Sequence, residues 1–230
     1  MEPAEFDKYA ARYRELHAGN IGASGEEPEY FSAYKARDLA LELAQRQAVA
    51  PRVLDFGSGI GTLVPFLRQH VPDAAIVCVD VSRQSLAHAA AAHGETASFV
   101  AYGGAVLPFR EGSFDAAIAA CVFHHIDPGV HVALLRDLAR VLRPGGLVMV
   151  YEHNPWNPLT RRAVDTCDLD RNAILIDGPT MLARMRSAGL RQCRLDYRVF
   201  FPAALRWLRP LEGALRWLPA GAQYFVTGLR

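Results

Sequence analysis

From residue 52 onward, short continuous apolar runs alternate with stretches in which apolar residues recur every three or four positions. Continuous runs of this length predict strands buried on both faces, and the periodic stretches predict helices. The strand-like runs lie at 52–56, 75–80, 98–102, 114–123, 147–152, 190–201 and 222–230. The helical stretches lie at 62–70, 82–93, 128–142 and 179–189. This order predicts an α/β fold with a doubly wound, seven-stranded and mostly parallel sheet, whose ligands bind at the carboxyl ends of the strands.

The first part of the chain has a different pattern. Phe6, Tyr9, Tyr13 and Leu16 fall at helical spacing and precede a glycine-rich stretch, so we expect a short helix followed by a loop. Residues 29–48 have the pattern of a longer amphipathic helix.

Composition narrows the class of protein. The 230 residues suit one α/β domain, and 51% hydrophobic against 21% charged residues indicates a full core. The net charge of +1 gives no basic footprint for nucleic acid as a partner. We expect no signal peptide and no membrane-spanning helix. The cysteines are scattered without a CxxC pair, so we expect reduced thiols in a cytoplasmic protein: Cys78, Cys121, Cys167 and Cys193.

A glycine-rich loop follows the first predicted strand directly. It reads Gly57-Ser58-Gly59-Ile60-Gly61, so its third glycine comes one position earlier than in the dinucleotide fingerprint GxGxxG. Glycines let a ligand approach the backbone closely, and the next helix points its N–H groups at that ligand. Asp55 lies two positions before the first glycine. Its carboxylate is poorly placed beside a pyrophosphate and suits a ligand with an ammonium group.

Asp80 closes the second predicted strand. In a doubly wound fold, a carboxylate at this place binds ribose hydroxyls. The alternative is that Asp80 caps the next helix, a role that Ser82 is equally suited to fill.

At this point the sequence resembles a known family. VLDFGSGIG, VCVDVS, VLPFREGSFDAAIA and LRPGG are similar to successive motifs of the class I S-adenosylmethionine-dependent methyltransferases. The resemblance covers residues 35–151 and is strongest to the branch that includes the quinone-biosynthesis C-methyltransferases. It implies a Rossmann-like fold with an antiparallel last strand and S-adenosyl-L-methionine as cofactor. It also implies one domain (1–230) with an N-terminal helical lid (1–48), a cofactor-binding core (49–151) and substrate-side elements (152–230).

The resemblance also implies roles for single residues around the cofactor. The loop of Gly57, Ser58, Gly59 and Gly61 would wrap its methionine part, with Asp55 facing the amino group. The family's usual adenine-binding Asp is missing, because Gly103 stands at its place. The remaining cofactor contacts are then expected from Asp80 on ribose, from Val81, Gly104 and Ala105 on adenine, and from Cys121 on the methionine moiety.

Candidate groups for the methyl acceptor follow the fourth and fifth predicted strands. Methyl transfer mainly needs alignment of the reactants, and a general base helps where the nucleophile is a hydroxyl or an acidic carbon. We favour Glu152 or His153 as the polar contact to the acceptor, with His124 as the best alternative. His125, Asn154 and Trp156 are further candidates for substrate binding. The competing interpretation is that the loop histidines and Asn154 only bind backbone groups.

These histidines and Glu152 have the residue types of a metal site. However, we expect adjacent histidines in a loop or strand to point in different directions, and no HxH or HxxxH spacing occurs. The sequence therefore predicts no metal.

Two further segments are expected near the cleft. The N-terminal region would form a lid or wall together with Tyr30, Phe31, Tyr34 and Lys35. Tyr9 and Tyr13 would contact cofactor or substrate. Residues 202–219 are rich in Leu, Trp and Arg. They predict either a packed helical hairpin or a surface that meets a lipid, since Arg and Trp suit a membrane boundary.

The sequence thus favours a methyltransferase acting on a small apolar metabolite, such as a quinone, polyketide, isoprenoid or lipid-like molecule. A catalytically inactive module that binds S-adenosylmethionine is the main alternative, and a nicotinamide-dependent reductase is a weaker one. We expect a monomer or a homodimer.

Overall fold

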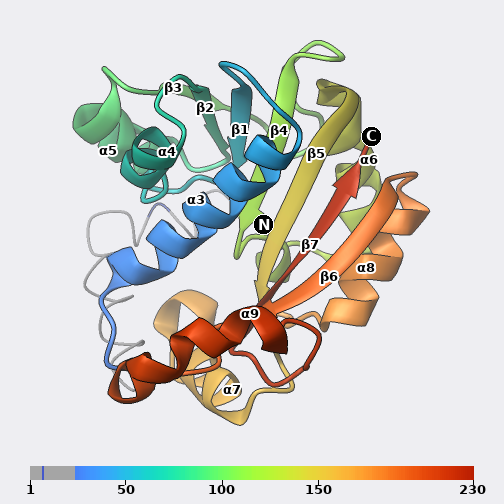
Figure 1. Ribbon diagram of the computed structural model, residues 1–230. Coiled ribbons are helices and arrows are strands. Elements are labelled where there is room, and N and C mark those ends of the chain that lie inside the picture. Colours follow the sequence, from blue (N-terminus) through green and yellow to red (C-terminus); the bar gives the residue numbers. More distant parts are fainter. Residues whose placement is uncertain (1–6, 8–23) are drawn as a thin grey trace.

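Seven strands form a single sheet in the computed structural model, which describes residue 7 and residues 24–230 (Figure 1). The strand order is β3-β2-β1-β4-β5-β7-β6. Neighbours from β3 to β5 are parallel, and β7 is antiparallel to both β5 and β6. The predicted fold class, including the antiparallel last strand, is confirmed. The strands are β1 Arg52–Phe56, β2 Ala75–Asp80, β3 Ser98–Ala101, β4 Phe114–Ala120, β5 Leu142–His153, β6 Arg191–Arg198 and β7 Gln223–Leu229.

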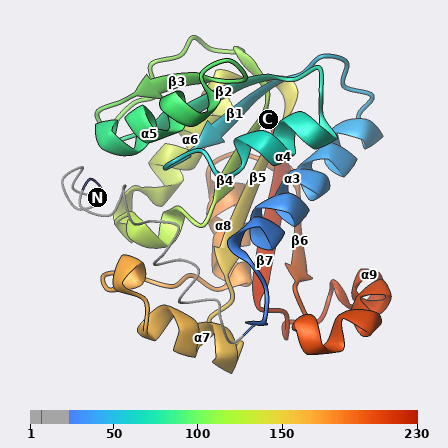
Figure 2. The same ribbon diagram turned by 90° about the vertical axis from the view of Figure 1, so that its left-hand side faces the viewer.

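Helices cover both faces of this sheet (Figures 1 and 2). On one face lie α3 (Pro28–Gln45) and α4 (Val64–His70), and on the other α6 (His131–Val141) and α8 (Gly178–Ser187). The helix α5 (Arg83–His93) packs on β2 and β3. The remaining segments are η3 (Phe123–His125), η4 (Pro128–Val130), α7 (Pro158–Asp165), η5 (Asp168–Asp170), η6 (Ala203–Leu211) and α9 (Glu212–Leu215).

The alternation of side chains along β5 divides the core into two layers. Val148 and Val150 pack toward α6 and α8, whereas Met149 and Tyr151 pack toward α3 and α4. All of these side chains are buried, which is why the strand reads as a continuous apolar run in the sequence. The same alternation decides which polar side chains at the end of β5 reach the cleft.

Short polar side chains fix the starts of several helices. The Ser82 hydroxyl accepts a hydrogen bond from the Ser85 amide, so Ser82 is the N-cap of α5. Asn157 caps α7 and Asp177 caps α8 in the same way. Each such cap typically stabilises a helix by about 1 kcal/mol. The capping role left open between Asp80 and Ser82 therefore belongs to Ser82.

Three strand boundaries differ from the sequence prediction by three or more residues. The strand β4 ends at Ala120 because Cys121 has φ +59° and the chain then turns into η3. The strand β5 begins at Leu142, where a register shift lies opposite Phe114 and Ala116. The strand β6 ends at Arg198, before Val199 with φ +62°.

Residues 202–219 are helical but do not form a packed hairpin. No residue of η6 or α9 is buried. Trp207 is 71% exposed and Trp217 is 74% exposed. Within the described part of the chain, no helix combines the length and apolar content needed to cross a bilayer.

Candidate active site

A cleft of about 310 Å³ opens at the carboxyl ends of β1, β2, β4 and β5. This is where a doubly wound sheet binds its ligands, and the volume lies within the usual range of ligand pockets. The glycine loop after β1 forms one side of the cleft, and histidines after β4 and at the end of β5 form another. Its lining also includes Phe31, Ser32 and Lys35 of α3, and Leu159, Thr160 and Val164 of α7.

The three glycines after β1 have different functions, although all have positive φ, at +70° for Gly57, +52° for Gly59 and +79° for Gly61. A Cβ at Gly59 would meet nothing within 4 Å, so this position opens into the cleft. A Cβ at Gly57 would lie 2.6 Å from Val122 on the cleft wall. A Cβ at Gly61 would instead lie 3.2 Å from Ala89 and His93 of α5. Gly57, Ser58 and Gly59 line the cleft, whereas Gly61 serves the packing against α5.

Asp55 is a buried carboxylate with an unsatisfied oxygen. It is 1% exposed, and its Oδ2 has no hydrogen-bond partner among the described residues. Burial raises the pKa of Asp55 to about 7, with a further contribution from the negative charge of Asp80 and an opposing one from Lys35. A buried carboxylate of this kind is stabilised by a cationic partner. The site therefore fits the ammonium group of a ligand such as S-adenosylmethionine.

Asp80 organises the neighbouring part of the cleft. Its Oδ2 accepts a hydrogen bond of 2.8 Å from the Gly59 amide, and its Oδ1 accepts one of 2.8 Å from the Ser82 amide. Burial raises its pKa, against these hydrogen bonds. Asp80 and Val81 both line the cleft. Gly104 and Ala105 do not, although a Cβ at Gly104 would lie 3.7 Å from Val81.

The expectation that His124 and His125 point apart is wrong. Their ring centroids are 4.1 Å apart, and the Nε2 atoms of both lie 3.4 Å from Oδ1 of Asp170. The reason is that the segment forms the tight turn η3 instead of an extended loop. His153 joins this cluster, with its ring 5.2 Å from that of His124. All three histidines line the cleft.

Glu152 does not occupy the position that the sequence suggested. It is fully buried and is not part of the cleft lining. Its Oε1 accepts hydrogen bonds from the amides of Val122 and Phe123, and its Oε2 lies 2.5 Å from Nδ1 of His124. The alternation along β5 explains this, because Glu152 continues the row of Val148 and Val150, away from α3. Of the three candidates for the acceptor contact, only His124 and His153 therefore line the cleft, and Glu152 holds His124 from behind.

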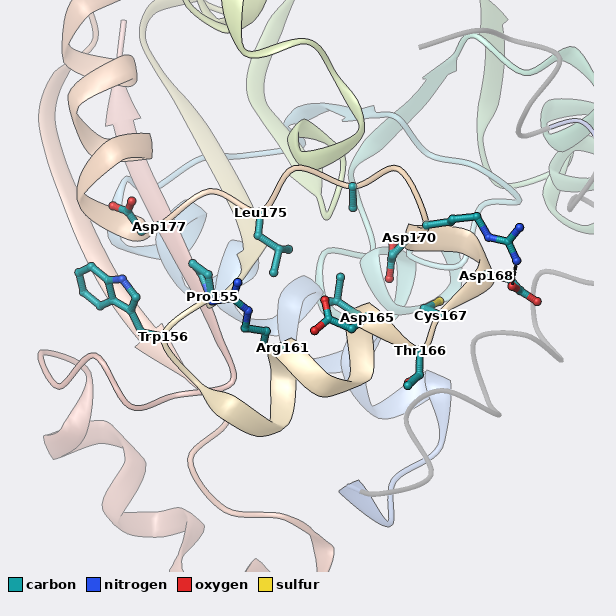
Figure 3. A pocket seen from close by; sticks show the side chains of 13 residues that line it. Pro155, Trp156, Arg161, Asp165, Thr166, Cys167, Asp168, Asp170, Leu175 and Asp177 are labelled. Atoms are coloured by element: carbon teal, nitrogen blue, oxygen red, sulfur yellow. Dashed lines mark hydrogen bonds and ion pairs between the residues drawn. The ribbon is translucent and has the colours of Figure 1, made fainter.

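Asn154 and Trp156 also lie outside the cleft lining. The Asn154 amide group donates to the carbonyls of Pro219 and Gly221, and its Oδ1 accepts from the Trp156 amide. Asn154 therefore joins β5 to the segment before β7, as the competing interpretation held. Trp156 is 53% exposed and borders a second cavity of about 660 Å³ behind α7, which also contains Arg161 and Asp177 (Figure 3).

Of the aromatic residues expected at the cleft, Phe31 lines it and Tyr30 does not. The Arg209 guanidinium lies 4.5 Å from the centre of the Tyr30 ring, so Tyr30 joins α3 to η6. Tyr9 and Tyr13 lie outside the described residues.

Sequence reasoning missed Asp170 and gave Lys35 no role beyond the lid. Asp170 comes from η5, where the irregular sequence gives no sign of a site, and it borders both cavities beside Cys167 (Figure 3). Lys35 comes from α3, and its Nζ donates to Sγ of Cys121 at 3.3 Å. Although burial alone would raise the pKa of Cys121, Lys35 and His153 lower it to about 7. Cys121, assigned to the cofactor from the sequence, does line the cleft.

Comparison with known proteins agrees with this geometry. Residues 53–146, which contain β1, the glycine loop and β4, match the family model described as a methyltransferase domain. Residues 53–146 thus match a methyltransferase domain, and the chain resembles the class I S-adenosylmethionine-dependent methyltransferases. Such a domain takes S-adenosylmethionine as its cofactor, in agreement with the fit of Asp55.

Curated relatives place the domain closer to one branch. The chain is 36% identical over 124 residues to demethylmenaquinone methyltransferase of Thermus thermophilus, covering 53% of each protein. It is 32% identical over 123 residues to ubiquinone/menaquinone biosynthesis C-methyltransferase UbiE of Hahella chejuensis, covering 49% of the chain and 47% of the relative. The chain thus spans about half the length of the curated relatives it matches, and it resembles quinone C-methyltransferases.

The fold extends over the whole length of a solved structure. A methyltransferase from Thermotoga maritima, described as S-adenosylmethionine-dependent and a possible histamine N-methyltransferase, superposes with a TM-score of 0.66. The alignment covers 98% of both chains at 16% sequence identity. At this identity the likeness shows the Rossmann-like fold alone.

Proposed function

We propose that this protein is a methyltransferase that acts on a small apolar metabolite of the quinone or lipid-like kind. The observation that carries the proposal is the carboxylate of Asp55, whose Oδ2 has no hydrogen-bond partner among the described residues. It lies in the same cleft as the open position of Gly59 and a cluster of histidines. When bound, S-adenosylmethionine supplies a methyl group on a sulfur that readily leaves. The resemblance to quinone C-methyltransferases supports the class of acceptor.

The residues of the chain divide the work between two sides of the cleft. Asp55 would hold the cofactor's ammonium group, Gly59 would let the backbone approach, and Asp80 would accept hydrogen bonds from ribose. On the other side, His124, whose Nδ1 is held by Glu152, and His153 would bind the polar atom of the acceptor. Phe31, Leu159 and Val164 would surround its apolar part and exclude water.

Binding of S-adenosylhomocysteine, the product of the cofactor, tests the first half of the proposal. At about 100 times its Kd, it should raise the free energy of unfolding by about 2.7 kcal/mol. Gly59→Val should abolish this stabilisation by filling the cleft. The matched control is Gly145→Val, because Gly145 has φ +78° and equally open space but lies in the turn of β5 away from the cleft.

The two alternatives predict other results. A nicotinamide-dependent reductase would be stabilised by NADH and not by S-adenosylhomocysteine. An inactive binding module would bind S-adenosylhomocysteine but transfer no methyl group. Incubation with labelled S-adenosylmethionine and reduced quinones with chains of increasing length separates it from an enzyme, since an enzyme produces labelled quinone.

We also propose that η6 and α9 meet a lipid surface that delivers the acceptor. Trp207 and Trp217 are exposed, and residues 202–219 contain three arginines and one glutamate. Trp side chains and basic charge favour an anionic membrane boundary. Pro202 lies at the cleft, so this segment adjoins its opening.

Flotation with vesicles containing anionic lipid tests the surface. The double variant Trp207→Ser/Trp217→Ser should no longer bind the vesicles. Val49→Ser is the control, because Val49 is 90% exposed but lies before β1, at the opposite end of the sheet. Equal flotation of both variants would contradict the proposal.

A further inference from the structure

The histidine cluster holds an arrangement that the binding of cofactor and acceptor does not by itself require. His124, His125 and Asp170 each offer one ligand atom, and these three atoms lie within 4.8 Å of one another. We propose that they form a binding site for a divalent transition-metal ion of the Zn²⁺ class. The site deepens the proposed function, on which it rests, because the ion would bind an oxygen of the acceptor.

The distances in the cluster suit a shared ion better than direct hydrogen bonds. Nε2 of His124 and Nε2 of His125 each lie 3.4 Å from Oδ1 of Asp170. A charge-assisted N–H···O bond would be about 2.7–2.9 Å long. Two ligand atoms that each lie about 2.1 Å from a tetrahedral zinc ion are separated by about 3.4 Å. The observed spacing is therefore that of two edges of a zinc coordination shell.

Glu152 gives His124 the orientation of a metal ligand. Its Oε2 lies 2.5 Å from Nδ1 of His124, and its other oxygen is held by two backbone amides. A histidine that binds a metal through one nitrogen almost always donates its other N–H to a carboxylate or carbonyl, which fixes the tautomer. With its proton on Nδ1, His124 directs the lone pair of Nε2 toward Asp170. This explains why a fully buried glutamate stands behind the cleft.

The cluster is built into the protein and still accessible from the cleft. The side chains of His124, His125 and Asp170 are 1%, 13% and 12% exposed. All three nevertheless line the cleft, so a coordination position remains for a ligand that enters there. Three protein ligands with an open position are characteristic of catalytic zinc sites, whereas structural sites are closed by four.

The ligand types select the kind of ion. Two imidazoles and one carboxylate suit Zn²⁺ or Fe²⁺, whereas Mg²⁺ and Ca²⁺ prefer oxygen ligands alone. The ligands belong to η3 and η5 and are separate from the glycine loop after β1. The ion and the cofactor would therefore be held by different residues, and acceptors with a hydroxyl or carbonyl oxygen would be preferred.

The test is a calorimetric titration of the tag-free, full-length protein, stripped with a chelator, with Zn²⁺ alone. The unmodified protein should bind one ion per chain. Glu152→Gln should weaken binding by about 10–100-fold, the usual effect of losing an outer-shell partner, and Asp170→Asn should weaken it more. Asp168→Asn is the matched control, since Asp168 lies on the same η5 but its side chain is 58% exposed and outside the cluster.

Binding of S-adenosylhomocysteine by the same samples separates the two proposals. The metal site is overturned if the protein binds S-adenosylhomocysteine but no Zn²⁺. It is also overturned if the Asp170→Asn and Asp168→Asn variants bind Zn²⁺ equally well. Either result leaves the methyltransferase proposal intact. The opposite result is that the unmodified protein binds Zn²⁺, that Asp170→Asn abolishes this binding, and that S-adenosylhomocysteine does not bind. This result would support the metal site and refute the proposed function. Circular dichroism spectra of each variant establish that a loss of binding is not a loss of fold.

Discussion

Replacement of Asp55 by Asn gives a sharp test of the cofactor side of the cleft. Burial raises the pKa of this carboxyl from its ordinary value of 3.8 to about 7, and Asp80 adds to the effect. Because the folded pKa lies above the unfolded one, ionisation of Asp55 destabilises the native state as pH rises from about 4 to about 7. Above pH 7 the penalty is complete, and at 1.36 kcal/mol per pKa unit it amounts to about 4 kcal/mol.

Without ligand at pH 8, the free energy of unfolding of the Asp55→Asn variant should therefore exceed that of the unmodified protein by up to about 4 kcal/mol. At pH 4 the substitution should have no effect from this source. Urea unfolding between pH 5 and pH 8 measures the difference. The control is Asp73→Asn, because Asp73 is exposed on the surface. Parallel stability curves for the unmodified protein and Asp55→Asn would refute the reasoning.

Ligand binding should depend on pH in the opposite direction, because ionised Asp55 destabilises the free protein but attracts a cationic ligand. If an ammonium group binds ionised Asp55, the affinity for S-adenosylhomocysteine should rise about tenfold per pH unit below pH 7 and level off above it. Binding at pH 6 should release close to one proton, which titrations in buffers of different ionisation enthalpy detect. In Asp55→Asn the pH dependence and the proton release should disappear together with most of the affinity. A persistent proton release in this variant would assign the linkage to another group.

Three further predictions concern other parts of the site. Glu152→Gln should lower the free energy of unfolding by about 1–3 kcal/mol, because buried charged hydrogen bonds are lost. The affinity for S-adenosylhomocysteine should stay within about twofold, and a large loss of affinity would mean that Glu152 contacts the cofactor. Lys35→Met should raise the pKa of Cys121 above its value of about 7, seen as a shift to higher pH in thiolate absorbance; an unchanged titration would show that Lys35 does not act on this thiol. Ser82→Ala should cost about 1 kcal/mol of stability in urea unfolding and Ser82→Gly only a few tenths, provided that Ser82 acts as the helix cap.

The cofactor side of the cleft was open to prediction because it is local in sequence. The strand β1, the glycines and Asp55 lie within a stretch of ten residues, and Asp80 ends the next strand of the same unit. Their positions follow from the strand–loop–helix order, because glycines in such a loop usually let a ligand approach the backbone. Gly61 is the exception, because its role depends on how closely α5 approaches, which the loop alone does not specify.

The acceptor side depended on contacts between distant segments. Asp170 reaches His124 and His125 only because the segment after α7 folds back over the end of β4, and no motif marks that return. Lys35 meets Cys121 because α3 crosses the sheet beside β5.

The sequence by itself determined the class of fold, the ligand-binding edge of the sheet and the glycine loop, since periodicity and spacing encode local structure. Only the tertiary structure decided which polar side chains face the cleft. The choice between Glu152 and His153 shows the reason. On a strand buried on both faces, every position is apolar, so the pattern hides which face each residue takes. That assignment comes from the register of β5 between β4 and β7, which turns His153 into the cleft and Glu152 behind His124.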